Sequence, residues 1–151
     1  YDPAALRPFS IDALWEHSQR VADLSGRVAA EERAGDAVVR EAALAGLFHD
    51  IGQLTLASQL PGPYREVLAL VGSYRLPVAE AERRVLGATH AEVGAYLLGL
   101  WGIPDRVVEA VAWHHTPSLC PGVRFNALTA VHVADALVRP HDESTLDLEY
   151  L

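Results

Sequence analysis

The spacing of the apolar residues constrains the fold of this chain most strongly. The inward positions Leu14, His17, Val21, Leu24 and Val28 recur at three- and four-residue steps, which is the period of one face of an α-helix. No alternating apolar–polar stretch is long enough to predict a β-strand. We therefore expect an all-α fold.

Loops that contain proline or glycine separate the expected helices. The first helix should begin near Ser10 or Asp12, either of which can cap it. The other expected helices are 37–51, 64–74, 78–101, 104–115 and 126–138. We expect Gly52 to end the second helix, and Gly87 to mark a break if 78–101 forms two helices. Residues 61–63 and 117–124 are expected to be loops, and 141–151 stays unassigned.

The composition fits one compact domain over residues 1–151. Half of the residues are hydrophobic and 21% are charged, which supplies a sizeable core. The net charge of −8 argues against nucleic acid or an anionic membrane surface as a partner. No apolar run approaches the ~20 residues of a membrane-spanning helix. The single cysteine, Cys120, excludes an internal disulfide framework and fits a reducing, cytoplasmic location.

Ionisable residues occupy positions where the helical pattern leads us to expect apolar ones. Three of them take inward steps in apolar series, namely His17, His90 and Asp135. Two adjacent pairs stand at the ends of expected helices, His49-Asp50 and His114-His115. A buried carboxylate is costly unless it is paired, hydrogen-bonded or bound to a metal. Imidazole and carboxylate groups together suit divalent zinc, iron, manganese, cobalt or nickel.

Each of these residues also has a simpler interpretation. A single histidine on an apolar face is more often a hydrogen-bonded core residue than a metal ligand. Asp135 could be a buried acid that pairs helices. Because several such coincidences would have to occur independently, a shared metal site explains the set better. His132 and His141 fit no such pattern, and we expect them to be ordinary surface or partly buried residues.

In their order along the chain, these residues resemble the HD superfamily of metal-dependent phosphohydrolases, and more narrowly its HDOD family. The matching stretches are 14–18, 45–52, 89–97, 101–104, 114–117 and 131–137, within a resemblance that covers about residues 9–138. The family implies a compact helical HD-type domain in which ligands converge from several helices. It also implies a bacterial cytoplasmic signal-transduction protein, for example a response regulator, in which the domain is fused to a receiver or another signalling module.

The resemblance also implies one or two divalent metal ions (iron, manganese, nickel, zinc or cobalt). The residues that would hold the first ion are His17, His49, Asp50 and Asp135. Asp50 would bridge to a second ion, whose other ligands would be His90, His114 and His115. Bound metals would activate water for attack on a phosphoester, with Asp50 as the central catalytic group. Relatives with three metals add a glutamate where this chain has Ala13, so at most two ions are expected.

The chain departs from the pattern of active relatives at two places. HD phosphohydrolases commonly place a lysine after the glycine that follows His-Asp, whereas Gln53 follows Gly52 here. An amide at this substrate-binding position can donate a hydrogen bond but cannot neutralise a phosphate. The HD-GYP group of cyclic-di-GMP phosphodiesterases continues past its paired histidines with a glutamate and a Gly-Tyr-Pro signature. Thr116 and Pro117 follow here instead, so the resemblance does not support that substrate.

The resemblance leaves two main hypotheses for the function. In the favoured one, the domain is a regulatory or binding module that retains the metal site. In the alternative, it is a metal-dependent phosphohydrolase that acts on a nucleotide or another phosphoester. A metal-free histidine network is a third and weaker hypothesis.

The organisation of HDOD proteins gives expectations about the rest of the protein. These domains usually place several helices before the segment that here is 15–17, and this sequence contains no methionine at all. We therefore expect the chain to be the C-terminal half of a longer HDOD region from which upstream segments have been removed. The expected partners are an upstream receiver or other signalling domain of the same chain, a nucleotide or phosphoester ligand, and further copies of the protein.

Overall fold

The computed structural model describes residues 9–121, 124–139 and 146–151. Within these ranges the chain is helical and contains no strand, which confirms the expected all-α fold. The helices are α1 (Ile11–Glu31), α2 (Asp36–Phe48), α3 (Ile51–Gln59), α4 (Pro61–Tyr74), α5 (Val78–Leu86), α6 (His90–Leu100), α7 (Asp105–Trp113) and α8 (Ala127–Val138). A short 3-10 helix, η2 (Pro117–Leu119), lies in the expected loop between α7 and α8.

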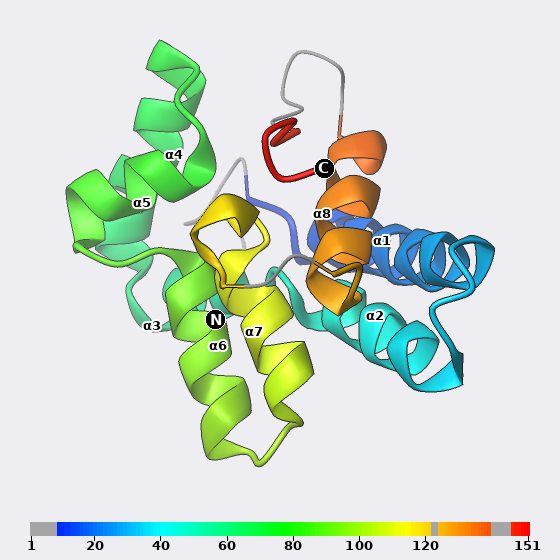
Figure 1. The fold of residues 1–151 in the computed structure, drawn as a ribbon. Coiled ribbons are helices and arrows are strands. Elements are labelled where there is room, and N and C mark those ends of the chain that lie inside the picture. The colour runs from blue at the N-terminus through cyan, green and yellow to red at the C-terminus, as the bar shows by residue number, and fades with distance from the viewer. Residues whose placement is uncertain (1–8, 122–123, 140–145) are drawn as a thin grey trace.

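The helices form two groups that are joined through α6 and α7 (Figure 1). On one side, α1, α2 and α8 pack on one another, and α7 contacts both α2 and α8. On the other side, α4 pairs with α5, while α3 contacts α4 and α6. Because α6 also packs along α7, the two groups meet in the middle of the molecule.

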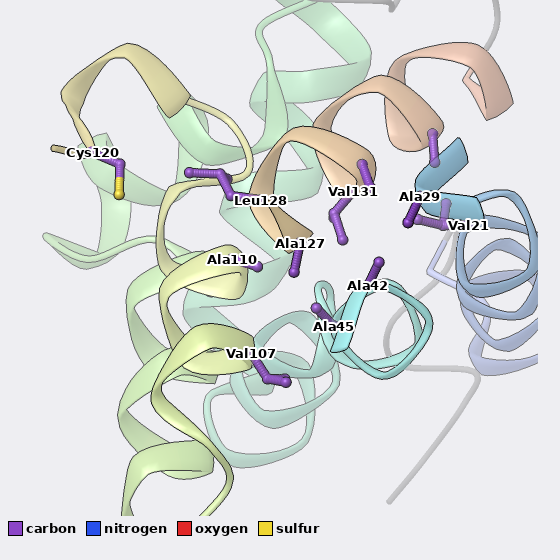
Figure 2. Packing of buried hydrophobic residues seen from close by; sticks show 12 residues of the cluster. Val21, Ala29, Ala42, Ala45, Val107, Ala110, Cys120, Ala127, Leu128 and Val131 are labelled. Atoms are coloured by element: carbon purple, nitrogen blue, oxygen red, sulfur yellow. The ribbon is translucent and has the colours of Figure 1, made fainter. Parts of the chain in front are cut away.

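Small side chains line much of the core between α1, α2, α7 and α8 (Figure 2). Ala42 and Ala45 come from α2, Val107 and Ala110 come from α7, and all four side chains are fully buried. Small residues let helices approach closely while the interior stays well packed. The helix α2, which the sequence predicts to be central, is thus enclosed by α1, α7 and α8.

The helices α1 and α2 approach each other closely at Gly46. A Cβ atom there would lie 2.8 Å from Ser25 Oγ and 2.9 Å from Ala22 Cα. A larger side chain would push the two helices apart. This contact matters for function, because α1 carries His17 and α2 leads directly into His49.

Two expected boundaries are wrong. The chain leaves α2 after Phe48 and enters α3 at Ile51, so Gly52 is an interior residue of α3 and not the end of a helix. The expected loop 61–63 is also wrong, because α4 begins at Pro61. Proline suits the first turn of a helix, where its missing N–H would have had no intrahelical partner.

Two other boundaries agree with the sequence. Ser10 caps α1, and its Oγ accepts a hydrogen bond from the backbone N–H of Ala13. Gly87, with a φ of +76°, ends α5 and separates it from α6. A residue with a Cβ would be strained in this left-handed conformation, so glycine fits the break.

Candidate metal centre

The ionisable residues that stand out in the sequence meet where the two groups of helices join. They are His17 of α1, His49 and Asp50 between α2 and α3, His90 of α6, His114 and His115 after α7, and Asp135 of α8. Most of them are buried, whereas the side chain of His17 is 21% exposed. The structure therefore brings all seven residues together, and their role as ligands stays a prediction.

Asp50 lies at the centre of the cluster, and its two carboxylate oxygens face different histidines. Asp50 Oδ2 lies 3.2 Å from His49 Nε2 and 3.8 Å from His17 Nε2. Asp50 Oδ1 lies 3.1 Å from His90 Nε2 and 3.9 Å from His114 Nε2. A carboxylate with one oxygen on each side has the arrangement needed to bridge two metal ions.

The ligand atoms divide into two sets that share Asp50. In the set that we call the α6–α7 subsite, all ligand atoms lie within 4.8 Å of one another, and its members are Asp50, His90, His114 and His115. The same limit holds in the α1–α8 subsite for His17, His49 and Asp50. Asp135 adjoins the second set, since its Oδ1 lies 3.0 Å from His17 Nε2 and 3.6 Å from His49 Nε2.

Backbone hydrogen bonds orient two of the buried imidazole rings. His49 Nδ1 lies 2.7 Å from Gly46 O, and His114 Nδ1 lies 2.8 Å from Val111 O. A carbonyl oxygen can only accept, so each Nδ1 carries a proton and donates. In the neutral ring, the lone pair then lies on Nε2, which faces Asp50. This is the tautomer that coordination through Nε2 requires.

Arg139 places a positive charge beside the α1–α8 subsite, and the sequence analysis missed it. Its Nε lies 2.9 Å from both carboxylate oxygens of Asp135. Its Nη2 lies 3.8 Å from Asp50 Oδ2. The sequence does contain a signal for this ion pair, because Asp135 and Arg139 are four residues apart at the end of a helix.

Glu82 is a second functional candidate that the sequence analysis missed. It is fully buried on α5, and its Oε2 lies 2.6 Å from His90 Nδ1 and 2.7 Å from the backbone N of His90. The signal was present in the sequence, because Glu82 takes an inward step between Val78 and Val85 on an amphipathic helix.

His132 is not the ordinary surface or partly buried residue that we expected. It is buried, its Nδ1 donates to His114 O at 2.7 Å, and its Nε2 accepts from the backbone N–H of Asp147 at 2.8 Å. It thereby holds the turn that presents His114 and His115. Helical periodicity could not reveal this, since α8 is buried on most sides. His141 lies outside the described residues.

Without a bound metal, protonated and neutral imidazoles surround the central carboxylate. Burial lowers the pKa of His49, but Asp50 and Asp135 outweigh that effect and raise the pKa to about 10. Burial is likewise outweighed by neighbouring carboxylates at His90, whose pKa rises to about 9. Burial and then the charges of His49 and His90 lower the pKa of His114 to about 3. A divalent cation would therefore compete with protons for part of this cluster.

The cluster fits a divalent transition metal. Asp50 Oδ1 and His114 Nε2 are buried and have no hydrogen-bond partner within the part of the chain that the structure describes. Buried polar atoms in this state are costly unless an ion or another group satisfies them. A metal ion would engage both lone pairs, and the set of imidazole and carboxylate donors suits zinc, iron, manganese, cobalt or nickel.

Gly52 allows Asp50 and His90 to approach each other. A Cβ atom at Gly52 would lie 2.0 Å from His90 O and 2.9 Å from Gly94 N, and backbone atoms cannot move aside as a flexible side chain can. The first turn of α3 therefore packs directly on the first turn of α6. This contact leaves no room for a Cβ atom at position 52, which explains why α3 has a glycine there.

Gln53 lies in the first turn of α3, next to the cluster in the chain. Its backbone N–H donates to Asp50 O at 2.9 Å, and the residue is buried. The amide brings no charge to this position. Its role in substrate binding stays a prediction.

Comparison with known proteins shows the family of this chain. The family model of the HDOD domain matches residues 3–117, which is most of the chain. The chain belongs to the HDOD family. An HDOD domain protein of unknown function from Geobacter sulfurreducens has a similar structure, with a TM-score of 0.79 and 28% identity. The match covers 86% of this HDOD chain and 43% of that chain.

Other similar proteins are longer than this HDOD chain, which matches only part of each. A candidate phosphohydrolase from Shewanella amazonensis shares the fold, with a TM-score of 0.76 and 22% identity over 91% of this chain and 51% of that one. An uncharacterized protein from Treponema pallidum is 23% identical over 133 residues. A Ribonuclease Y from Thermus thermophilus is 33% identical over 136 residues. The matches cover 26% and 18% of the lengths of these two relatives.

None of the described helices combines the length and the apolar character that crossing a bilayer needs.

Proposed function

We propose that this HDOD domain binds one or two divalent transition-metal ions at the candidate metal centre and acts as a regulatory signalling module. The observation that carries the proposal is the position of Asp50. Each of its two carboxylate oxygens faces the Nε2 atoms of two histidines. A single carboxylate in this position can serve both subsites at once.

A metal explains the cluster better than a network of hydrogen bonds alone. Such a network is partly present, since His90 Nε2 lies 2.9 Å from His115 Nε2 and His17 Nε2 lies 3.2 Å from His49 Nε2. One proton can satisfy each of these pairs. Asp50 Oδ1 and one histidine Nε2 nevertheless find no hydrogen-bond partner among the described residues. A bound cation would be the missing partner of these two atoms.

The charges beside the centre favour regulation over efficient hydrolysis. Bound metals would supply Lewis acidity and activate water. Gln53 adds no positive charge for a phosphate, and Arg139 is engaged by Asp135 through two short contacts. The residues are thus better suited to holding metal than to neutralising a phosphoester. We infer that output passes through contacts with other signalling domains of the same chain, or through a bound nucleotide.

Hydrolysis of a phosphoester is the second candidate, and two observations favour it. The shared carboxylate between two imidazole sets is the arrangement of two-metal hydrolases. In addition, a 33% identical relative is named Ribonuclease Y. The match covers only 18% of that relative, so its activity comes to this chain as a hypothesis.

Metal analysis tests the proposed metal centre. Wild-type protein purified without chelator or affinity metal should contain about one or two transition-metal ions per chain by elemental mass spectrometry. A variant with His49→Ala and Asp50→Ala should contain none while its helical circular dichroism persists. Asp23→Ala is the matched control, because this acid is exposed on α1. Equal metal content in wild type and the double variant would refute the assignment.

A phosphodiesterase assay separates the two candidate functions. The substrate is a simple chromogenic phosphodiester, and manganese, iron and nickel are supplied separately. If the site is a weakened hydrolase, Gln53→Lys should raise turnover by roughly a hundredfold, because a charged contact to phosphate is restored. If the domain is regulatory, wild type, Gln53→Lys and Asp50→Ala should share the same background rate.

A further inference from the structure

Glu82 is a buried carboxylate outside the two metal subsites, and it contacts His90 of the α6–α7 subsite directly. Its exposed fraction is zero, which makes an ionised side chain costly unless it is well paired. Glu82 Oε2 lies 2.6 Å from His90 Nδ1 and 2.7 Å from the backbone N of His90. Glu82 Oε1 accepts a hydrogen bond from Tyr64 Oη at 3.3 Å.

Two nearby acidic residues of α5 and α6 behave differently. Glu80, two residues earlier on α5, is exposed and pairs with Arg84. Glu92 of α6 is exposed and pairs with Arg83. Glu82 alone among these three acids turns inward and contacts a predicted metal ligand.

The position of His90 explains why a carboxylate from another helix is used. His49 and His114 follow the last residues of α2 and α7, so each donates from Nδ1 to a carbonyl three residues earlier in its own helix. His90 is the first residue of α6 and has no preceding helical turn. Its Nδ1 therefore needs an acceptor from elsewhere. The start of a helix also favours an anion, because its first N–H groups have no intrahelical partner.

We propose that Glu82 is a positioning residue of the metal centre. It holds the His90 ring with Nδ1 as the donor, so that Nε2 points at Asp50 Oδ1. A carboxylate acceptor also makes His90 a stronger donor to a metal than a ring anchored by a neutral carbonyl. Through Tyr64, the same carboxylate ties the pair of helices α4 and α5 to the α6–α7 subsite. The proposal rests on the proposed metal-binding function.

Metal affinity of Glu82→Gln tests this role. The matched control is Glu80→Gln, an exposed acid on the same helix. Dissociation constants for Co²⁺ are measured by competition with a chromophoric chelator, and the visible absorption of the bound Co²⁺ reports its coordination. Glu82→Gln should bind about 10- to 100-fold more weakly in the α6–α7 subsite and with an altered spectrum. Glu80→Gln should match wild type.

Each outcome of this experiment decides between the proposals. Wild-type affinity and an unchanged Co²⁺ spectrum in a folded Glu82→Gln variant would overturn the positioning role while leaving the metal centre intact. Failure of the wild type to bind Co²⁺ would overturn the proposed function itself. If Glu82→Gln does not fold by circular dichroism, Tyr64→Phe decides, because it removes only one hydrogen bond to Glu82. It should weaken binding about three- to fivefold, and unchanged affinity would count against the proposal.

Discussion

The two halves of the candidate metal centre are built in different ways. In the α6–α7 subsite, His90 and His114 are buried, and each ring is fixed through Nδ1 by an acceptor behind it. In the α1–α8 subsite, the His17 side chain is 21% exposed, and Asp135 already has Arg139 as a counter-charge. The α6–α7 subsite is thus preorganised for a metal ion. In the α1–α8 subsite, the guanidinium of Arg139 already supplies part of the positive charge that a metal would bring.

This difference suggests an order of metal binding. A preorganised set of donors loses little conformational entropy on binding, whereas a partly exposed ring has more freedom to lose and a paired acid must share its charge. We therefore expect the α6–α7 subsite to bind metal more tightly. The predictions below test this expectation, starting with the largest effect.

Removal of metal should lower the free energy of unfolding more than any substitution below, and the loss of protection should differ between the two subsites. At a free metal concentration of about 100 times Kd, binding adds about 2.7 kcal/mol to the free energy of unfolding, and a chelator removes this contribution. Urea denaturation with and without chelator measures the total. Hydrogen exchange then locates it, and protection should fall more in residues 87–92 and 113–117 than in 10–18. Equal losses in both regions would contradict the proposed order.

Removal of one histidine from each half compares the subsites directly. His90→Ala removes a buried and doubly anchored ligand, so we expect the tightest metal site to weaken by at least roughly a hundredfold. His17→Ala removes a ligand that is partly exposed, and we expect roughly a tenfold loss confined to the weaker site. Calorimetric titration with Zn²⁺ or Co²⁺ measures both. A larger loss in His17→Ala would reverse the order of the subsites.

Much of the fold is predictable from the sequence, because most helix ends carry a local chemical signal. Ser10 and Gly87 mark the start of α1 and the end of α5 as expected. The turn at His49 and Asp50 is not predicted, because apolar residues flank it on both sides and the Asp50 side chain, at the N-cap of α3, makes no capping hydrogen bond. Gly52 looks like a helix end in sequence. Its actual role depends on a contact with α6, which lies far away in the chain.

The candidate site shows the same division between local pattern and tertiary contact. The histidines and aspartates stand out, because they interrupt apolar series along single helices. Glu82 and Arg139 went unnoticed, because each acts through a predicted ligand, and because charged residues are common both along a helix such as α5 and at the end of a helix such as α8. Sequence also could not show that the two oxygens of Asp50 face different histidines, which depends on how the helices pack.

Gly52→Ala should loosen the contact between α3 and α6, which brings Asp50 close to His90. The added methyl would meet backbone atoms of His90 and Gly94, so α3 and α6 must separate. Overpacking of this kind should lower the free energy of unfolding by about 2 kcal/mol. Gly99→Ala on α6 is the matched control, because its Cβ would meet open space. The control should gain up to about 1 kcal/mol from helix propensity. Equal stabilities of the two variants, measured in urea, would rule out the close contact.

Arg139→Gln should have the smallest effect, and the size of the stability loss should depend on whether metal is bound. In the metal-free protein, the variant leaves the nearly buried Asp135 without the guanidinium that contacts both of its oxygens. The loss of charged hydrogen bonds should lower the free energy of unfolding by about 1 to 2 kcal/mol. Arg27→Gln is the matched control, since Arg27 pairs with Asp23 at the same spacing on an exposed surface. Arg27→Gln should lower the free energy of unfolding by less than about 0.5 kcal/mol.

Saturating metal should then reduce the difference between Arg139→Gln and wild type. A cation in the α1–α8 subsite would replace the missing guanidinium as the counter-charge of Asp135, so the variant gains more from metal than wild type does. Urea denaturation of both proteins with and without metal gives the four values required. If the deficit of Arg139→Gln is the same in both conditions, Asp135 does not share its charge with a metal. In that case the α1–α8 subsite is a salt bridge, and only the α6–α7 subsite remains as a metal site.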